Sequence, residues 1–357
     1  MFSIIKVLLL FWPSFLHANE CLKDAVIKTY NPKYAKHFKI YEYKDFKRLA
    51  VDNYQFIITK SSDLSCSDVD SIIRLPISRV GLTSTTYLPS LNFLKKQETL
   101  KAFQGKKYIV SNSFNKKQIQ ELSFKLNSEK LVSLNLDLIM AYEANLNSKK
   151  DFELFRKLHL PVVINKDFEE TSPLARAEWI VFNANFFGLE DSAIKYFSKI
   201  EENYLNLKAQ NNKASKRPNI LVGNIQNGYW VTCGGKSDLA QMIEDAGANL
   251  AFKTDKSETQ QISLENFIMK KSQYDFWIPQ NDWKNHLDLE NGVKKDSRYK
   301  FIQAKKVFNN TLVLNKDNFN DYWEEGMQRP DLVLSDLSAI FHPENFKNYK
   351  MRWYISL

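Results

Sequence analysis

Polar and aromatic side chains follow several segments of this sequence that are typical of β-strands. Open α/β sheets bind their ligands at the carboxyl ends of the strands. Hydroxyl and amide groups there bond the polar atoms of a ligand, and aromatic rings contact its flat or apolar faces. The candidate ligand-binding residues at such positions are Ser84, Thr85, Thr86, Tyr87, Tyr142, Asn227, Tyr229, Trp230 and Trp283.

Several other kinds of chemistry are disfavoured. Gly234-Gly235-Lys236-Ser237 lacks the G-x-x-x-x-G-K-[ST] spacing of a phosphate-binding loop. Cys233 has no histidine at a motif spacing that would activate a thiol, and we expect it to be buried. The three cysteines and five unclustered histidines supply neither a metal cluster nor a histidine-rich metal carrier. We therefore expect no catalytic residues, no metal site and no intrinsic cofactor.

Two arginines leave alternatives open. The planar guanidinium groups of Arg79 and Arg176 suit an anionic ligand group, but ion pairing to a neighbouring carboxylate is the favoured interpretation. His286 and His342 are compatible with either the binding site or the surface.

The composition describes a globular chain. Its 357 residues are enough for two domains, and 44% are hydrophobic and 25% charged. The net charge is +9, yet no run of Lys and Arg exceeds two residues, so we expect no nucleic-acid partner. A positive net charge mildly favours an anionic ligand.

The first residues predict export. Residues 1–18 combine Lys6, an apolar run over 7–12 and small residues near Ala18, which is typical of a secretory signal peptide. The apolar run is too short to span a membrane. We expect a periplasmic protein that begins near Asn19.

Cys21 follows this segment and has two interpretations. Glu20 stands where a lipoprotein signal needs a small residue, so a lipid anchor is the less favoured one. Export exposes thiols to oxidation, which favours a disulfide between Cys21 and Cys66.

Alternating apolar and polar residues divide the chain into α/β segments. The expected strands are 38–43, 54–59, 71–76, 78–82, 107–110, 137–142 and 160–164, then 219–223, 275–279 and 311–314. The expected helices are 115–126, 149–158, 237–246, 263–271 and 331–341, with two more between the strand-rich parts. The first of these two starts at Ser172-Pro173 and ends near Gly188.

The second linking helix covers about 190–209 and has an apolar stripe. Its length of about 30 Å is enough to join two lobes. We therefore expect an N-terminal α/β lobe over 19–170, linking helices over 171–216 and a C-terminal α/β lobe over 217–357, with mainly parallel sheets. The stripe consists of Ala193, Phe197, Ile200, Tyr204 and Leu207.

A weak internal repeat relates the two lobes. In each, a polar cap, Asn127 or Ser263, is followed two residues later by a glutamate, Glu129 or Glu265. An apolar pair and a strand that opens with aspartate come next in both.

Several segments resemble the class III periplasmic solute-binding proteins of ABC importers, which carry iron–siderophores, haem and cobalamin. Leu136 stands where that family usually has proline. The similar segments are Arg79 to Tyr87, Ser128 to Ile139, Glu170 to Ile180, Arg329 to Leu337 and Ile340 to Pro343.

The resemblance implies two lobes joined by one long rigid helix, with a metal chelate bound in the cleft between them. It also implies a monomer that delivers the chelate to a dimeric ABC permease in the inner membrane. Glu129 and Glu265 would then dock one lobe on each permease half. The alternatives are a zinc or manganese solute-binding protein of the same fold, and a two-lobed metal-cluster enzyme.

Overall fold

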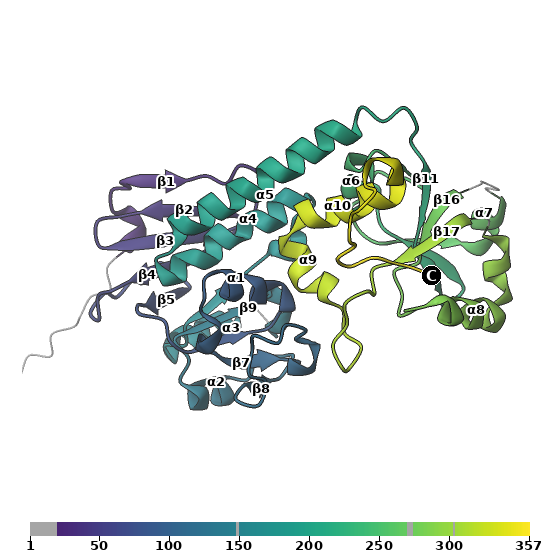
Figure 1. The fold of residues 1–357 in the computed structure, drawn as a ribbon. Coiled ribbons are helices and arrows are strands. Elements are labelled where there is room, and N and C mark those ends of the chain that lie inside the picture. The colour runs from purple at the N-terminus through teal and green to yellow at the C-terminus, as the bar shows by residue number, and fades with distance from the viewer. Residues whose placement is uncertain (1–19, 148–149, 270–273, 303) are drawn as a thin grey trace, which may run out of the picture.

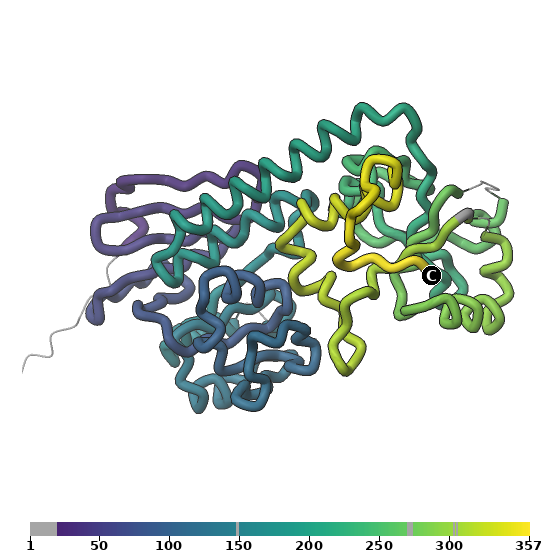
Figure 2. The backbone as a smooth tube through the Cα atoms, in the orientation of Figure 1, coloured from purple at the N-terminus to yellow at the C-terminus, as the bar shows by residue number. Residues whose placement is uncertain are grey.

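The computed structural model describes residues 20–147, 150–269, 274–302 and 304–357. The predicted signal peptide lies outside these residues. Two lobes stand side by side, and one long helix passes over both (Figures 1 and 2). This is the two-lobed α/β fold, with mainly parallel sheets, that the sequence predicts.

The N-terminal lobe contains two sheets. The first has the order β1-β2-β3-β4-β5 and is antiparallel except for the β4–β5 pair. The second is fully parallel, with the order β10-β9-β6-β7-β8. Their strands are β1 (Lys28–Tyr30), β2 (Phe38–Glu42), β3 (Phe46–Val51), β4 (Tyr54–Thr59), β5 (Ser71–Arg74), β6 (Val80–Leu82), β7 (Leu100–Gln104), β8 (Gln120–Leu122), β9 (Leu138–Ala141) and β10 (Val162–Ile164).

The C-terminal lobe repeats the parallel arrangement. Its main sheet has the order β14-β11-β16-β17-β18, antiparallel only at β18, and a small antiparallel sheet has the order β12-β13-β15. The strands are β11 (Asn219–Val222), β12 (Asn224–Gln226), β13 (Tyr229–Thr232), β14 (Asn249–Leu250), β15 (Gln260–Ser263), β16 (Tyr274–Ile278), β17 (Ala304–Asn309) and β18 (Ile355–Ser356).

The linking helix α5 (Glu190–Asn211) holds the lobes together. Four residues of its predicted stripe are buried and Leu207 is partly buried. Near one end Phe197 meets Tyr34 of the N-terminal lobe, and further along the Tyr204 hydroxyl donates to Asp245 of the C-terminal lobe at 2.7 Å. The remaining helices are α1 (Leu88–Phe93), α2 (Ser128–Leu134), α3 (Lys150–Lys157), α4 (Pro173–Ala184), α6 (Asp238–Asp245), α7 (Leu264–Met269), α8 (His286–Lys295), α9 (Glu325–Gln328) and α10 (Pro330–Phe341).

Three predicted elements are wrong. Residues 107–110 form no strand, because Val110 donates its N–H to Glu324 and the carbonyls of Lys107 and Ile109 accept from Asn315. Residues 115–126 are turns around the edge strand β8, which pairs with β7. Residues 311–314 lie beyond the true strand β17, and only Leu314 makes a bridge, to Asn320.

The internal repeat has a matching structural basis in each lobe. The Asn127 side chain caps α2 by accepting from Lys130, and Ser263 accepts from the backbone of Asn266 in α7. An aspartate just before β9, and one at the second residue of β16, each accepts a backbone N–H from a residue at or just before the start of the neighbouring strand. These bonds join Asp137 to Ser78 and Asp275 to Asn219.

Candidate functional site

The carboxyl ends of strands in the main sheet of the C-terminal lobe border a cavity of about 340 Å³, whose lining residues all lie between Gly223 and Met327. Gly223 and Asn224 follow β11, and Gln280 follows β16, as expected for a ligand site in an open sheet. The volume is within the usual range for small-molecule sites. A second cavity of about 330 Å³ lies instead where β9 and β10 begin, beside Asp137 and Pro161, which is the wrong edge for such a site.

The cavity wall is polar and aromatic. Its polar groups are mostly uncharged amides and hydroxyls, and Asp238 is its one charged residue among those described. Trp323 is 47% exposed and presents its ring beside Tyr322, at a centroid distance of 4.9 Å. The uncharged polar members are Asn224, Gln226, Thr232, Ser237, Ser257, Thr259 and Gln280.

The N-terminal lobe reaches this cavity through the loop after β6. The Thr85 hydroxyl donates to the Trp323 carbonyl at 3.2 Å. The Ser84 hydroxyl accepts from the backbone of Thr86 at 3.2 Å and lies 2.8 Å from the Thr86 hydroxyl. This loop is therefore fixed by its own hydrogen bonds beside the exposed indole of Trp323.

A buried charge cluster joins the lobes beneath the loop. Arg176 of α4 donates to Asp238 of α6 at 2.7 Å. On its other side Arg176 interacts with Asp167, which follows β10 and hydrogen-bonds to Thr86. Burial raises the pKa of Asp167, although the Arg176 charge opposes this shift. Burial disfavours the charge of Arg176, but the two carboxylates raise its pKa overall.

Two atoms of this cluster have no hydrogen-bond partner although they are buried. They are Nε of Arg176 and Oδ1 of Asp167. Buried polar atoms are normally paired, and an unpaired one has room to bond water, an ion or a ligand group. Arg176 thus forms the ion pair that the sequence favoured, but its hydrogen-bonding capacity is only partly used.

Aromatic rings pack together at the carboxyl ends of β6, β9 and β10 in the N-terminal lobe. Tyr142 lies between Tyr87 and Phe168, with ring centroids 6.0 Å and 5.3 Å away. Phe168 is 48% exposed and Tyr142 is partly buried. Phe168 was not a predicted site residue, although its position after β10 was a signal that it could be one.

Three predicted contacts have no surface available to a ligand in this structure. Tyr87 is 2% exposed and donates its hydroxyl to the Asn165 carbonyl. Trp230 is fully buried, stacks on Phe267 and donates to the Val222 carbonyl. Ser84 is buried within its loop. Each group is already enclosed by its own lobe in this structure, and its contact with a ligand stays a prediction.

The other predicted C-terminal residues are more scattered. Asn227 lies with Gly228 in the turn of the β12–β13 hairpin, and its φ of 47° suits asparagine. Tyr229 is 45% exposed and shares a face of β13 with Val231, which lines the cavity. Trp283 packs against Trp277 and Tyr299 in a separate cluster.

The cysteines have different environments. Cys21 and Cys66 form a disulfide, with Cα atoms 5.5 Å apart. Cys233 is free and lines the cavity, and burial raises its pKa to about 11. A thiol with that pKa stays protonated near neutral pH and is a poor nucleophile.

The sequence analysis missed Asp167, Asp238 and Trp323. Asp167 follows a predicted strand, and Asp238 follows the Ser237 cap of a predicted helix, so position was a usable signal for both. Trp323 lies in a short 3-10 turn, η9 (Asp321–Trp323), which is too short for a periodic sequence pattern to predict it.

The segment 310–329 also connects the lobes. The Glu324 carboxylate accepts the backbone N–H groups of Val110 at 2.6 Å and Ser111 at 3.2 Å. Burial raises the pKa of this carboxyl group to about 7. Figure 1 shows the loop before α9 extending beside the N-terminal lobe.

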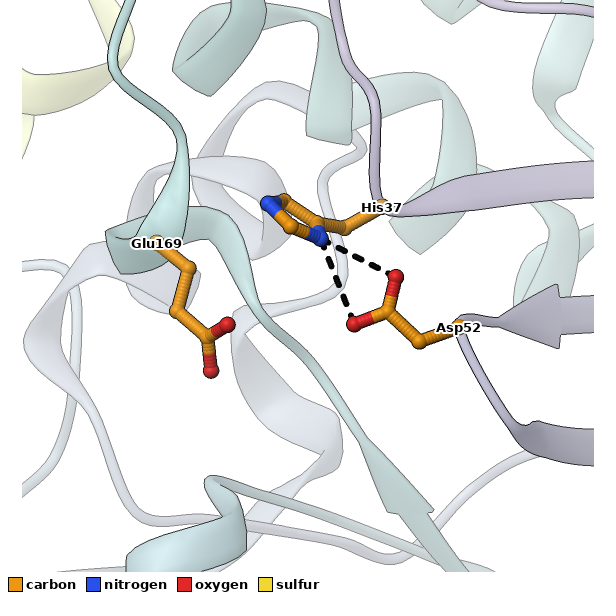
Figure 3. Close-up of side chains that lie close together, drawn as sticks. All are labelled: His37, Asp52 and Glu169. Carbon is orange, nitrogen blue, oxygen red and sulfur yellow. Dashed lines mark hydrogen bonds and ion pairs between the residues drawn. The ribbon is translucent and has the colours of Figure 1, made fainter.

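One group of potential metal ligands lies within the N-terminal lobe. His37, Asp52 and Glu169 approach one another where the β3–β4 turn meets the segment after β10 (Figure 3). The Lys166 ammonium group lies 2.9 Å from Asp52 and 3.3 Å from Glu169. This cation already occupies the position between the two carboxylates, so the group is better described as an ion-pair network than as a metal site.

The family comparison agrees with this architecture. A model of the periplasmic binding protein family matches residues 91–314. The chain belongs to this family. Its members are solute-binding proteins, not enzymes, and they work outside the cytoplasm with ABC permeases. The resemblance and the fold class that the sequence indicated are both confirmed.

Individual relatives are distant. An uncharacterized lipoprotein of Methanocaldococcus jannaschii is 24% identical over 302 residues, which cover 80% of this chain and 70% of the relative.

Three solved structures share the fold at low identity. A possible iron-binding periplasmic solute-binding protein of Staphylococcus epidermidis has 17% identity and a TM-score of 0.55, covering 74% of this chain and 99% of that one. A periplasmic haem-binding protein of Pseudomonas aeruginosa has 14% sequence identity and a TM-score of 0.55, and the match covers 79% of this chain and 98% of that one. The vitamin B12-binding protein BtuF of Vibrio cholerae has 12% sequence identity and a TM-score of 0.51, and the match covers 77% of this chain and 99% of that one.

Within the described part of this binding protein, none of the helices has the length and apolar character needed to cross a membrane.

Proposed function

We propose that this binding protein captures a metal chelate between its lobes and delivers it to an ABC permease. The observation that carries the proposal is the cavity at the carboxyl ends of the C-terminal main sheet, which has polar groups and the exposed ring of Trp323 around it. The Thr85 loop of the N-terminal lobe contacts Trp323 and so lies beside this cavity. Solved relatives of the same fold are described as binding iron, haem or vitamin B12. A cavity of about 340 Å³ has room for a ligand larger than a bare ion.

The proposed contacts are the groups that remain accessible. Trp323 lines the cavity, and Thr85 donates to its carbonyl. Tyr142 and Phe168 pack together after β9 and β10 of the N-terminal lobe, and Tyr229 shares a face of β13 with the cavity residue Val231. Trp323 makes the test direct, because a chelate stacked on its exposed indole quenches tryptophan fluorescence.

The experiment is a calorimetric and fluorescence titration with a ferric siderophore, haemin and cobalamin. We expect one chelate to bind with a dissociation constant of about 1 µM or below, equivalent to about 8 kcal/mol. Trp323→Phe should retain most of the calorimetric signal and lose a large part of the quenching. Absence of binding heat for every chelate would overturn the proposal.

A zinc or manganese carrier remains the second candidate for the sequence alone, but the structure gives it less support. The group of His37, Asp52 and Glu169 already holds the ammonium group of Lys166 and lies within the N-terminal lobe, whereas the cavity lies at the main sheet of the C-terminal lobe. Stoichiometric zinc retained after dialysis would favour this second candidate.

Export and docking complete the proposal. Residues 1–18 act as a signal peptide, and Cys21 is held in the disulfide with Cys66 and is not lipidated. A mature protein whose mass includes a lipid would contradict that assignment. Glu129 and Glu265 are both exposed near the start of equivalent helices, which suits docking to two equivalent permease halves.

A further inference from the structure

The charge balance of the cleft differs from that of the whole chain. The chain carries a net charge of +9, but Asp238 is the only charged residue among the described residues that line the cavity. The nearest guanidinium group, on Arg176, is only 14% exposed and is shared between Asp238 and Asp167.

This cluster has no surplus positive charge. With both carboxylates ionised it carries one net negative charge, and with Asp167 protonated it is neutral. Lys166, which precedes Asp167, is also neutralised, because it pairs with Asp52, Glu143 and Glu169. A strongly anionic ligand would therefore lose its hydration without gaining a free cation from this cluster or from Lys166.

The remaining wall offers many neutral hydrogen-bonding groups. The amides of Asn224, Gln226 and Gln280 and the hydroxyl groups of Thr232 and Thr259 all line the cavity. Such groups bond carbonyl, amide and hydroxyl atoms at the periphery of an uncharged ligand. The exposed ring of Trp323 can contact its apolar face or attract a positive charge.

We propose that the cleft selects metal chelates of zero or positive net charge, and that Asp238 and Asp167 set this selectivity by neutralising Arg176. This inference rests on the proposed capture of a metal chelate and narrows its ligand class. It reverses the weak expectation of an anionic ligand that the net charge suggested.

The test compares chelates of different charge on the same protein by calorimetry. The probes are an electroneutral ferric trihydroxamate, cationic aquacobalamin, a trianionic ferric tris-catecholate and haemin with its two propionates. We expect the best neutral or cationic chelate to bind at least about 100-fold more tightly than either anionic one. Tighter or equal binding of the tris-catecholate or haemin overturns the inference while leaving the proposed function intact. If none of the four binds, the proposed function fails and the inference fails with it.

Two variants assign the selectivity to the named residues. Asp238→Asn combined with Asp167→Asn leaves Arg176 as an uncompensated cation. The ratio of the affinity for the best neutral or cationic chelate to that for the anionic chelates should then fall by at least about 10-fold. Asp238→Asn alone should lower this ratio less. Asp63→Asn removes the same charge from an exposed loop of the N-terminal sheet and should leave the preference unchanged. An equal effect of Asp63→Asn would show that overall charge, and not this cluster, determines selectivity.

Discussion

Two residues of α4 carry buried charges on opposite faces of the helix, yet their surroundings differ. Glu178 is 1% exposed and accepts the Tyr30 hydroxyl and the backbone N–H groups of Lys33, Tyr34 and Ala35, at 2.8–2.9 Å. Arg176 contacts two carboxylates but leaves its buried Nε without a partner. The two positions are about 200° apart around the helix.

The difference in hydrogen bonding distinguishes a structural role for Glu178 from a role of Arg176 near the proposed site. Glu178 uses both oxygens to hold the segment 30–35 of the first sheet against α4, so its site is complete without a ligand. Arg176 and Asp167 still have free hydrogen-bonding capacity beside the cavity. Glu178 is therefore a structural joint, whereas Arg176 and Asp167 each keep an atom that water or a ligand can bond.

The largest effect should come from Glu178→Gln. An amide nitrogen would replace one acceptor oxygen and face two N–H donors that then lose their partner. Leaving buried donors unpaired should lower the free energy of unfolding by about 4 kcal/mol. Urea unfolding would measure the loss, with Glu202→Gln as the exposed control on α5. A loss below about 1 kcal/mol would show that the pairing of Glu178 contributes little to stability.

The expected effect of changing Glu324 on stability is intermediate and depends on pH. Its carboxyl group has a pKa of about 7, compared with an ordinary value of 4.5. A raised pKa means that the folded state binds the proton more tightly. The contribution of Glu324 to stability is thus fully present below the ordinary pKa and is lost as pH rises from about 4.5 to 7.

Glu324→Gln should remove that slope. Relative to the wild type, its unfolding free energy should rise by up to about 3 kcal/mol between pH 4.5 and 7 and change little above pH 7. Urea unfolding over a pH series would measure the difference. Parallel pH profiles for the two proteins would contradict the assigned pKa shift.

Asp238→Asn should have a smaller effect on stability than Glu178→Gln, although both changes replace a carboxylate with an amide. Asp238 is 21% exposed at its side chain, and Arg176 keeps Asp167 as a counter-charge. We expect a loss of about 1 kcal/mol in urea unfolding. A loss as large as that of Glu178→Gln would remove the distinction between the two faces of α4.

The smallest stability effect should come from Glu129→Ala with Glu265→Ala, because both side chains are exposed. The pair should abolish permease binding or transport while ligand affinity changes less than about twofold, or 0.5 kcal/mol. Transport assays and ligand titrations on the same variants separate these outcomes. A matching loss of ligand affinity would place the carboxylates in the cleft.

Local patterns account for the parts of the fold that could be predicted. The alternation at 54–59 corresponds to β4, and the stripe from Ala193 to Tyr204 is the buried face of α5. The Ser237 cap and Gly188, with its φ of 64°, set helix boundaries at the expected places. These signals succeed because their physical causes lie within a few residues.

The sequence by itself determined most of the periodic elements, the two-lobed class and the edges of the sheets where we propose that a ligand binds. Only the tertiary structure decided which side chains at those edges remain accessible, enclosing Tyr87 and Trp230 while leaving Trp323 exposed. It also paired Arg176 with Asp238, 62 positions away, and Val110 with Glu324, 214 positions away. Helix and strand periodicity is local, whereas burial and charge compensation depend on which distant segments pack together, so no local pattern encodes them.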